Sequence, residues 1–105
     1  MFCLQTVEPE VLPGDHHVTV VENQIGHLAC RFIGYPDLID WYRSDSLTPL
    51  SDPRFSVTRY LHEDFGAIDV SLSIENVSAS DYGVYRCEGR NSYGSAASYV
   101  WLNGM

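Results

Sequence analysis

Residues 81–87 read Asp-Tyr-Gly-Val-Tyr-Arg-Cys, and this stretch says more about the fold than any other part of the chain. Apolar and aromatic side chains recur in it at every second position, which predicts a β-strand over residues 83–89. Residues 90–94 read Arg-Asn-Ser-Tyr-Gly, a composition typical of a turn. Alternation resumes over residues 96–102, so the chain is predicted to end in two strands joined by a hairpin.

The same alternation runs upstream, and turn-forming clusters interrupt it at intervals near ten residues. No stretch shows the 3.6-residue period of a helix. A succession of short strands in a chain of 105 residues predicts an all-β fold of two packed sheets, a sandwich. The further predicted strands cover residues 17–21, 28–32, 38–43, 47–50, 55–61 and 68–74, with turns at 12–15, 34–37, 51–53 and 63–66.

Charge excludes two classes of partner. The chain has 6 Lys+Arg against 14 Asp+Glu, a formal net charge of −8, and all of its cations are scattered arginines. Binding to nucleic acid or to an anionic membrane surface is therefore not expected.

No apolar run approaches the length of a membrane span, and the first twelve residues do not resemble a signal peptide. We expect a soluble protein or fragment that does not itself insert into a membrane.

The three cysteines are predicted to form one pair and leave one spare. Cys30 and Cys87 lie inside apolar, alternating segments, whereas Cys3 lies near the chain end. A pair favours an oxidising, extracellular compartment. The spare thiol argues slightly for a reducing one, so the oxidation state of the pair stays open at this point.

The stretch at 81–87 resembles the immunoglobulin superfamily, whose penultimate strand carries aspartate, glycine, tyrosine and cysteine at alternate positions. The resemblance implies a two-sheet Greek-key sandwich in which Cys30 and Cys87 are joined between the sheets, with Trp41 packed against them. It also implies that Tyr85 forms the tyrosine corner of the family, with its hydroxyl bonded to the backbone upstream.

Other residues acquire structural roles from the same resemblance. Gly83 is expected to relieve crowding beside the corner, and Asp81 to pair with Arg54 at the start of an earlier strand. Leu72 is expected in the core as part of the same signature. None of these residues carries chemistry.

The resemblance is to the intermediate, or I-set, type. It extends over about residues 8–102, which predicts a single domain at residues 8–103 after a disordered or linker segment at residues 1–7. The long segment at 59–68 is similar to membrane-proximal domains of the lachesin and neurotrimin group of neuronal adhesion proteins. The I-set motifs are Gly-Tyr-Pro at 34–36, Ile-Asp-Trp-Tyr-Arg at 39–43, Leu-Ser-Ile-Glu-Asn-Val at 72–77 and Asn-Ser-Tyr-Gly at 91–94.

Catalytic, metal and cofactor sites are not predicted. Adjacent His16 and His17 would point to opposite faces of a strand, which is poor geometry for joint ligation. Glu63, Asp64 and Asp69 lack the glycine-spaced loop of a usual calcium site. No spacing of serine, histidine and aspartate suggests a nucleophile with its base, so we expect a protein that is not an enzyme and needs no cofactor.

The sequon Asn76-Val77-Ser78 permits N-glycosylation of Asn76 in a secreted protein. It also coincides with the ordinary end of a strand in I-set domains. It therefore supports secretion only weakly.

A candidate protein-binding face follows from the alternation in the last strands. If Ser98, Val100 and Leu102 point inward, Tyr99 and Trp101 point outward and share one sheet face. Exposed aromatics beside an arginine have the composition of a binding hot spot. A neighbouring domain covering these rings is the alternative. The predicted face comprises Tyr42, Arg86, Glu88, Tyr99 and Trp101.

Two functions fit this sequence. The first is a recognition module of a multidomain cell-surface or secreted protein, acting in cell adhesion or receptor assembly. Its partner would be another protein, the same or a related immunoglobulin-domain protein included, besides the neighbouring domains of its own chain. The alternative is an intracellular I-set module of a muscle filament or kinase-associated protein, cytoplasmic and sarcomeric, with a structural or docking role.

Overall fold

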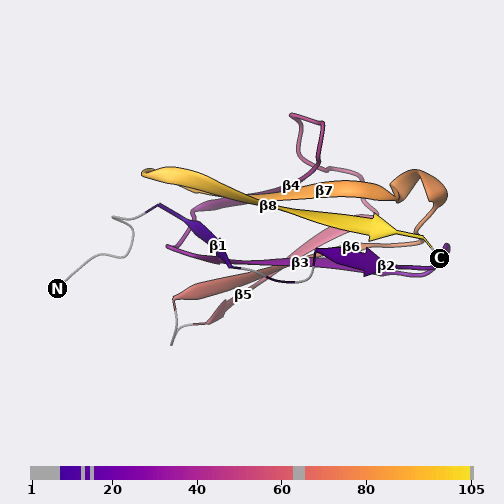
Figure 1. The fold of residues 1–105 in the computed structure, drawn as a ribbon, viewed down its shortest axis with the longest axis horizontal. Coiled ribbons are helices and arrows are strands. Elements are labelled where there is room, and N and C mark those ends of the chain that lie inside the picture. The colour runs from indigo at the N-terminus through magenta and orange to yellow at the C-terminus, as the bar shows by residue number, and fades with distance from the viewer. Residues whose placement is uncertain (1–7, 13, 15, 63–65, 105) are drawn as a thin grey trace.

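The computed structural model describes residues 8–12, 14, 16–62 and 66–104, and the described chain is all-β as predicted (Figure 1). The predicted segment at 1–7, Cys3 within it and most of the turn at 63–66 lie outside the described residues. The elements are β1 (Glu10–Leu12), β2 (His17–Thr19), β3 (Gly26–Ile33), β4 (Leu38–Arg43), β5 (Phe55–His62), β6 (Ala67–Ile74), the 3₁₀ turn η2 (Ala79–Asp81), β7 (Gly83–Asn91) and β8 (Gly94–Asn103).

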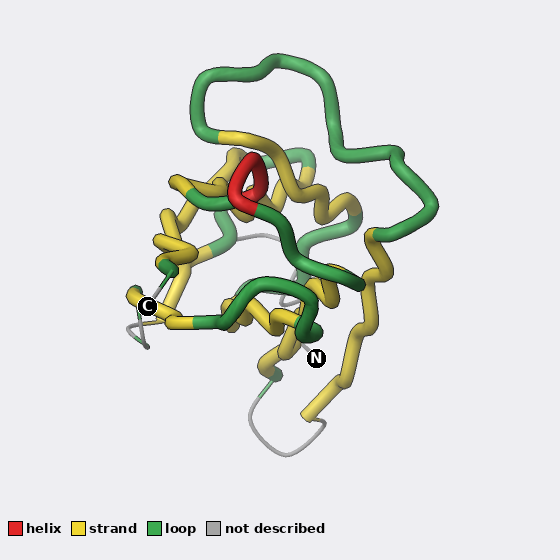
Figure 2. Tube along the Cα trace, turned by 90° about the vertical axis from the view of Figure 1, so that its right-hand side faces the viewer, coloured by secondary structure: helices red, strands yellow, loops and turns green. Residues whose placement is uncertain are grey.

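The strands form two four-stranded sheets, in the orders β1-β3-β6-β5 and β2-β8-β7-β4. They lie one above the other in Figure 1, and Figure 2 shows the same layers along the longest axis. Every pairing is antiparallel except that of β2 with β8, which is parallel. Among the described strands, the chain crosses between the two sheets from β3 to β4, from β4 to β5 and from β6 to β7, which gives the Greek-key connections of an immunoglobulin-like sandwich.

The core lies where the alternating apolar faces of the two sheets meet. A disulfide joins Cys30 of β3 to Cys87 of β7, and Trp41 is the cross-strand neighbour of Cys87. Each large side chain withdrawn from water contributes roughly 1.5–3 kcal/mol. The most completely buried side chains are Trp41, Tyr85, Phe32, Leu28, Leu72, Ile74, Leu102, Val70, Val77, Val100 and Cys87.

The strand predicted at residues 47–50 is wrong. This segment belongs to a loop that rises above β4 and β7 in Figure 1, and Leu47 within it is 93% exposed. Pro49 has no N–H to donate to a ladder, and Leu50 makes one backbone bond, from its N–H to the Trp41 carbonyl at 2.9 Å. The apolar pattern was misleading because Leu47 contacts water and Leu50 packs inward.

β1 was not predicted: it is three residues long and ends at Leu12, where the sequence predicted a turn over 12–15. β1 pairs with β3, whereas β2 pairs with β8 in the other sheet.

Within the described ranges, no helix has the length and apolar character needed to span a lipid bilayer.

Candidate protein-binding face

Four of the residues predicted as a fold signature, Arg54, Asp81, Gly83 and Tyr85, lie together at one end of β7, whereas Trp41 and Leu72 are buried in the core. The Arg54 guanidinium donates to both carboxylate oxygens of Asp81, at 3.0 and 2.9 Å, and the Ser78 N–H donates to Asp81 at 2.9 Å. Hydrogen bonding to Arg54 is the main reason that the pKa of Asp81 lies below its ordinary value, although burial opposes that shift. The Tyr85 hydroxyl donates to the Asp81 carbonyl at 2.6 Å, the geometry of a tyrosine corner.

Arg43 belongs to this corner, and the sequence analysis did not single it out. Its guanidinium lies 4.7 Å from the centroid of the Tyr85 ring and donates to the Tyr85 hydroxyl at 2.9 Å. It also donates to the Asp81 and Tyr82 carbonyls, both at 3.0 Å. Gly83 has φ +138°, and a Cβ there would lie 2.8 Å from Nη2 of Arg43. The crowding that Gly83 relieves therefore comes from Arg43.

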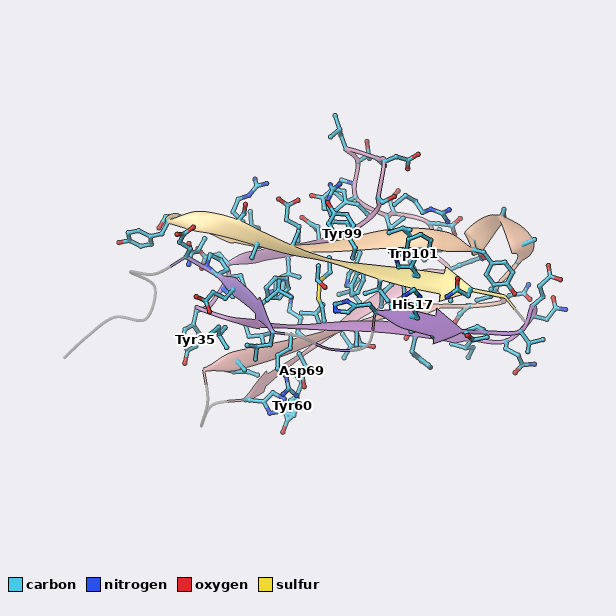
Figure 3. All side chains as sticks on the ribbon, in the orientation of Figure 1. His17, Tyr35, Tyr60, Asp69, Tyr99 and Trp101 are labelled. Carbon is cyan, nitrogen blue, oxygen red and sulfur yellow. A yellow bond between two sulfur atoms is a disulfide. The ribbon has the colours of Figure 1, made fainter. Side chains whose placement is uncertain are left out.

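The outer face of the β2-β8-β7-β4 sheet brings the predicted binding residues together. Tyr42, Arg86 and Tyr99 are cross-strand neighbours in one row. Tyr99 and Trp101 are 49% and 46% exposed, and Figure 3 shows both on the upper sheet. The five predicted residues thus share one face, but they are not equally available to a partner.

Arg86 is occupied within the domain. Its guanidinium lies 4.2 Å from the centroid of the Tyr42 ring, and it donates to the carbonyls of Ser44 and Ser46, both at 3.3 Å. Its Nε lies 3.7 Å from Glu88, and its side chain is only 16% exposed. Arg86 therefore holds the loop after β4, and of the five predicted residues only Tyr99 and Trp101 are exposed.

Two histidines extend the aromatic area. The ring of His17 stacks on Trp101 with centroids 5.9 Å apart, and His16 Nδ1 lies 3.2 Å from the Tyr99 carbonyl oxygen. The backbone N–H of Trp101 donates to the backbone carbonyl of His16 at 2.7 Å. The contacts of His16 and His17 with β8 were not predicted, because strands far apart in the chain pair without any local sequence signal.

Asp69, considered above for calcium, lies on the outer face of the other sheet and is engaged by protein groups. It pairs with Arg31 and lies 2.6 Å from His62, whose ring stacks on Tyr60 at 4.7 Å. Hydrogen bonding to Arg31 is the main cause that lowers the pKa of Asp69 to about 2. Glu63 and Asp64 lie outside the described residues. No three His, Cys, Asp or Glu side chains among those described come together in a way that could hold a metal ion.

Asn76 follows β6 in the turn before η2, is exposed and has φ +50°. Asparagine adopts this left-handed conformation more readily than most residues. Its side chain is open to solvent, as an attached glycan requires.

Comparison with known proteins gives the family. The model of the immunoglobulin I-set domain matches residues 9–103. The chain belongs to the immunoglobulin I-set family. Members of this family are in general not enzymes, and the disulfide and sandwich described above are those of an I-set domain.

The relatives of this I-set domain are much longer proteins. It is 34% identical over 97 residues to the muscle M-line assembly protein unc-89 of Caenorhabditis elegans, covering 91% of this chain and 1% of that protein. It is 30% identical over 109 residues to interleukin-1 receptor accessory protein-like 1-B of Danio rerio, covering 90% of this chain and 16% of that protein.

Solved structures share the fold of this I-set domain. The complex of Dpr2 Ig1-Ig2 with DIP-Theta Ig1-Ig3 contains a chain that superposes with a TM-score of 0.82 at 24% identity, covering 94% of this chain and 33% of that one. The relatives and structural neighbours thus include both receptor-type and muscle proteins.

Proposed function

We propose that this I-set domain is a protein-recognition module of a multidomain cell-surface or secreted protein, acting in adhesion or receptor assembly. The observation that carries the proposal is the pair of half-exposed aromatics, Tyr99 and Trp101, side by side on a sheet face that has no other element over it in the described chain. Aromatic side chains present a large, rigid contact area, and they dominate the binding energy of many interfaces.

Three further features support a surface location. The Cys30–Cys87 disulfide favours an oxidising compartment, since disulfides persist there and are rare in the cytosol. Asn76 of the sequon is exposed. One solved neighbour is titled as a complex between immunoglobulin-domain chains, and one relative is a receptor accessory protein.

The alternative is an intracellular module of a muscle filament, and the similarity to unc-89 and to titin of Drosophila melanogaster favours it. Mass spectrometry of this domain within the full-length protein, isolated from its natural tissue under thiol-blocking conditions, discriminates between the two. Glycan on Asn76 with an intact Cys30–Cys87 bridge supports the surface module. An unglycosylated Asn76 with both thiols free supports the filament module.

The binding face itself is tested with a panel of purified immunoglobulin ectodomains and surface plasmon resonance. Some ectodomains of the panel are expected to bind the wild-type domain. For these, replacing both Tyr99 and Trp101 with serine is expected to raise the Kd by about 30-fold or more, since a hot-spot aromatic contributes about 2 kcal/mol. Tyr60→Ser on the other sheet is the matched control. Equal binding by the double variant, or no binding by the wild type to any member, would overturn the proposal.

A further inference from the structure

The edge strands of the two sheets are protected to different degrees. Short edge strands are one means by which proteins prevent unwanted pairing, and β1 and β2 are three residues long. At the edge of β4, the Trp41 carbonyl accepts the Leu50 N–H at 2.9 Å. β5 is the remaining edge strand, at the lower margin of the molecule in Figure 1. It has eight residues, contains neither proline nor glycine, and pairs only with β6 within the described chain.

The register shows which backbone groups of β5 lie at its free edge. The Glu75 N–H donates to the Arg54 carbonyl at 3.0 Å, so Arg54, just before β5, faces the β6 side. Residues of an antiparallel strand alternate between those that bond to the partner strand and those that do not. Counting on from Arg54, the backbone N–H and C=O groups of Val57, Arg59 and Leu61 point to the free edge.

The side chains of the same three residues lie on the core side of the sheet, beyond the part that the other sheet covers. Val57 is the cross-strand neighbour of the buried Leu72, and directly opposite residues share a face. Val57 and Leu61 are nevertheless 49% and 46% exposed. A groove of about 500 Å³ lies beside them, between β5 and β4, and is lined in part by Ile39, Trp41, Leu50, Val57, Arg59 and Leu72.

Arg59 is the unpaired cation of this groove. The other five arginines each hold a carboxylate or a carbonyl, whereas Arg59 makes no hydrogen bond or ion pair with any described residue. An inward-pointing charge on an edge strand normally opposes pairing, because an added strand would bury the charge. That cost is offset when the added strand brings a carboxylate to the arginine.

We propose that β5 receives an extended segment of another protein as an added antiparallel strand, with an Asp or Glu of that segment opposite Arg59. In such strand addition, main-chain hydrogen bonds supply affinity and alternate side chains supply specificity. The segment's residues opposite Val57 and Leu61 point to the groove side, so apolar side chains suit them. The recognised pattern is therefore apolar–x–acidic–x–apolar.

The charges around the groove limit this pattern to one acid. Asp40 and Asp52 also line the groove, and Asp52 lies 3.8 Å from Arg54. A second carboxylate on the segment would face these like charges without a free cation to pair with, and the whole chain carries −8. We therefore expect a segment that is neutral apart from the residue opposite Arg59.

The test uses the blocked peptide acetyl-Thr-Val-Thr-Glu-Thr-Val-Thr-amide, titrated into the isotope-labelled wild-type chain and followed by NMR. A Kd of about 1 mM or tighter is expected. The amides of Val57, Arg59 and Leu61 should exchange with water about fivefold more slowly at about 4 mM peptide, because they gain acceptors in the bound state. The amides between them, which already bond to β6, should change little.

Arg59→Gln is expected to raise the Kd of this peptide about fivefold, since a partly exposed ion pair is lost. Replacing the glutamate of the peptide with glutamine should raise the Kd of the wild type by the same factor. Combining both changes should add little, because they remove one interaction. Arg90→Gln makes the same change of charge on the other sheet, where the Arg90 side chain is 58% exposed, and is expected to bind like the wild type.

Any of three results would overturn the inference: no binding by the wild type at about 10 mM peptide, ten times the expected Kd; equal binding of the glutamate and glutamine peptides; or slowed exchange outside β5 alone. Protection of the three β5 amides in the free chain that disappears on dilution would mean that a second copy occupies the edge, and would also defeat it. The inference goes beyond the proposed function and does not involve Tyr99 or Trp101. Its failure would leave the proposed function standing.

Discussion

Arg54 and Asp81 form a bidentate ion pair in which Nη1 of Arg54 donates to Oδ2 of Asp81 at 3.0 Å and Nη2 donates to Oδ1 at 2.9 Å. The Asp81 carbonyl meanwhile accepts from Tyr85 at 2.6 Å. One residue therefore ties the start of β5 and the η2 turn to β7. The pair links the two sheets at the end of the sandwich remote from the 91–94 hairpin.

Asp81→Asn is expected to destabilise the domain by about 3 kcal/mol, the lower end of the cost of breaking a buried pair, because the Arg54 side chain is 35% exposed. Urea unfolding followed by tryptophan fluorescence measures this loss. Asp40→Asn, which changes an exposed carboxylate, is the control and should stay within about 0.5 kcal/mol of the wild type. A loss no larger than the control's would show that the pair does not stabilise the fold.

Asp69 is expected to make stability depend on pH in acid. The pKa of Asp69 in the folded domain is about 2, below its ordinary value. The pairing of ionised Asp69 with Arg31 and His62 therefore contributes its full stability above about pH 4, where Asp69 is ionised in both the folded and the unfolded chain. This contribution is lost as the pH falls through the pKa of Asp69 in the folded domain. In Asp69→Asn, the free energy of unfolding should therefore fall less steeply between about pH 4 and pH 2. Parallel curves for variant and wild type would contradict this assignment.

The disulfide is expected to supply much of the stability of so small a domain. Cys30 and Cys87 close a loop with a sequence separation of 57, which by the chain-entropy model corresponds to about 4 kcal/mol. The double variant Cys30→Ala, Cys87→Ala should lose about that amount in denaturant unfolding. If the unfolding midpoint does not move, the bridge does not constrain the unfolded chain as this model requires.

Arg86→Ala is expected to release the loop after β4 and leave the sandwich intact. The carbonyls of Ser44 and Ser46 lose their donors, so the amides of Ser46 and Thr48 should exchange with solvent faster in hydrogen-exchange NMR. Arg90→Ala is the matched control, because the Arg90 side chain is 58% exposed and contacts only Glu88 among the partners described for it. Unchanged protection of both loop amides in Arg86→Ala would show that Arg86 does not order the loop.

Much of the fold followed from local pattern. Alternation predicted most of the strands, because apolar residues recur at every second position in them. The resemblance to the immunoglobulin family predicted the Cys30–Cys87 bridge and the Arg54–Asp81 pair. The pleat of a strand turns adjacent residues to opposite faces, so the outward direction of Tyr99 and Trp101 was also readable from the sequence. The segment at 47–50 defeated the same reasoning, since two leucines are too few to distinguish a strand from a loop.

The sequence by itself determined the fold class, the inward and outward sides of the strands and the acidic charge, because these depend on residue type and period alone. The tertiary structure decided that Arg43 fills the tyrosine corner, that Arg86 holds a loop instead of facing a partner, and that His17 stacks on Trp101. Each of these is a contact between residues remote in the chain. Its geometry exists only after the strands have paired, and no local period encodes it.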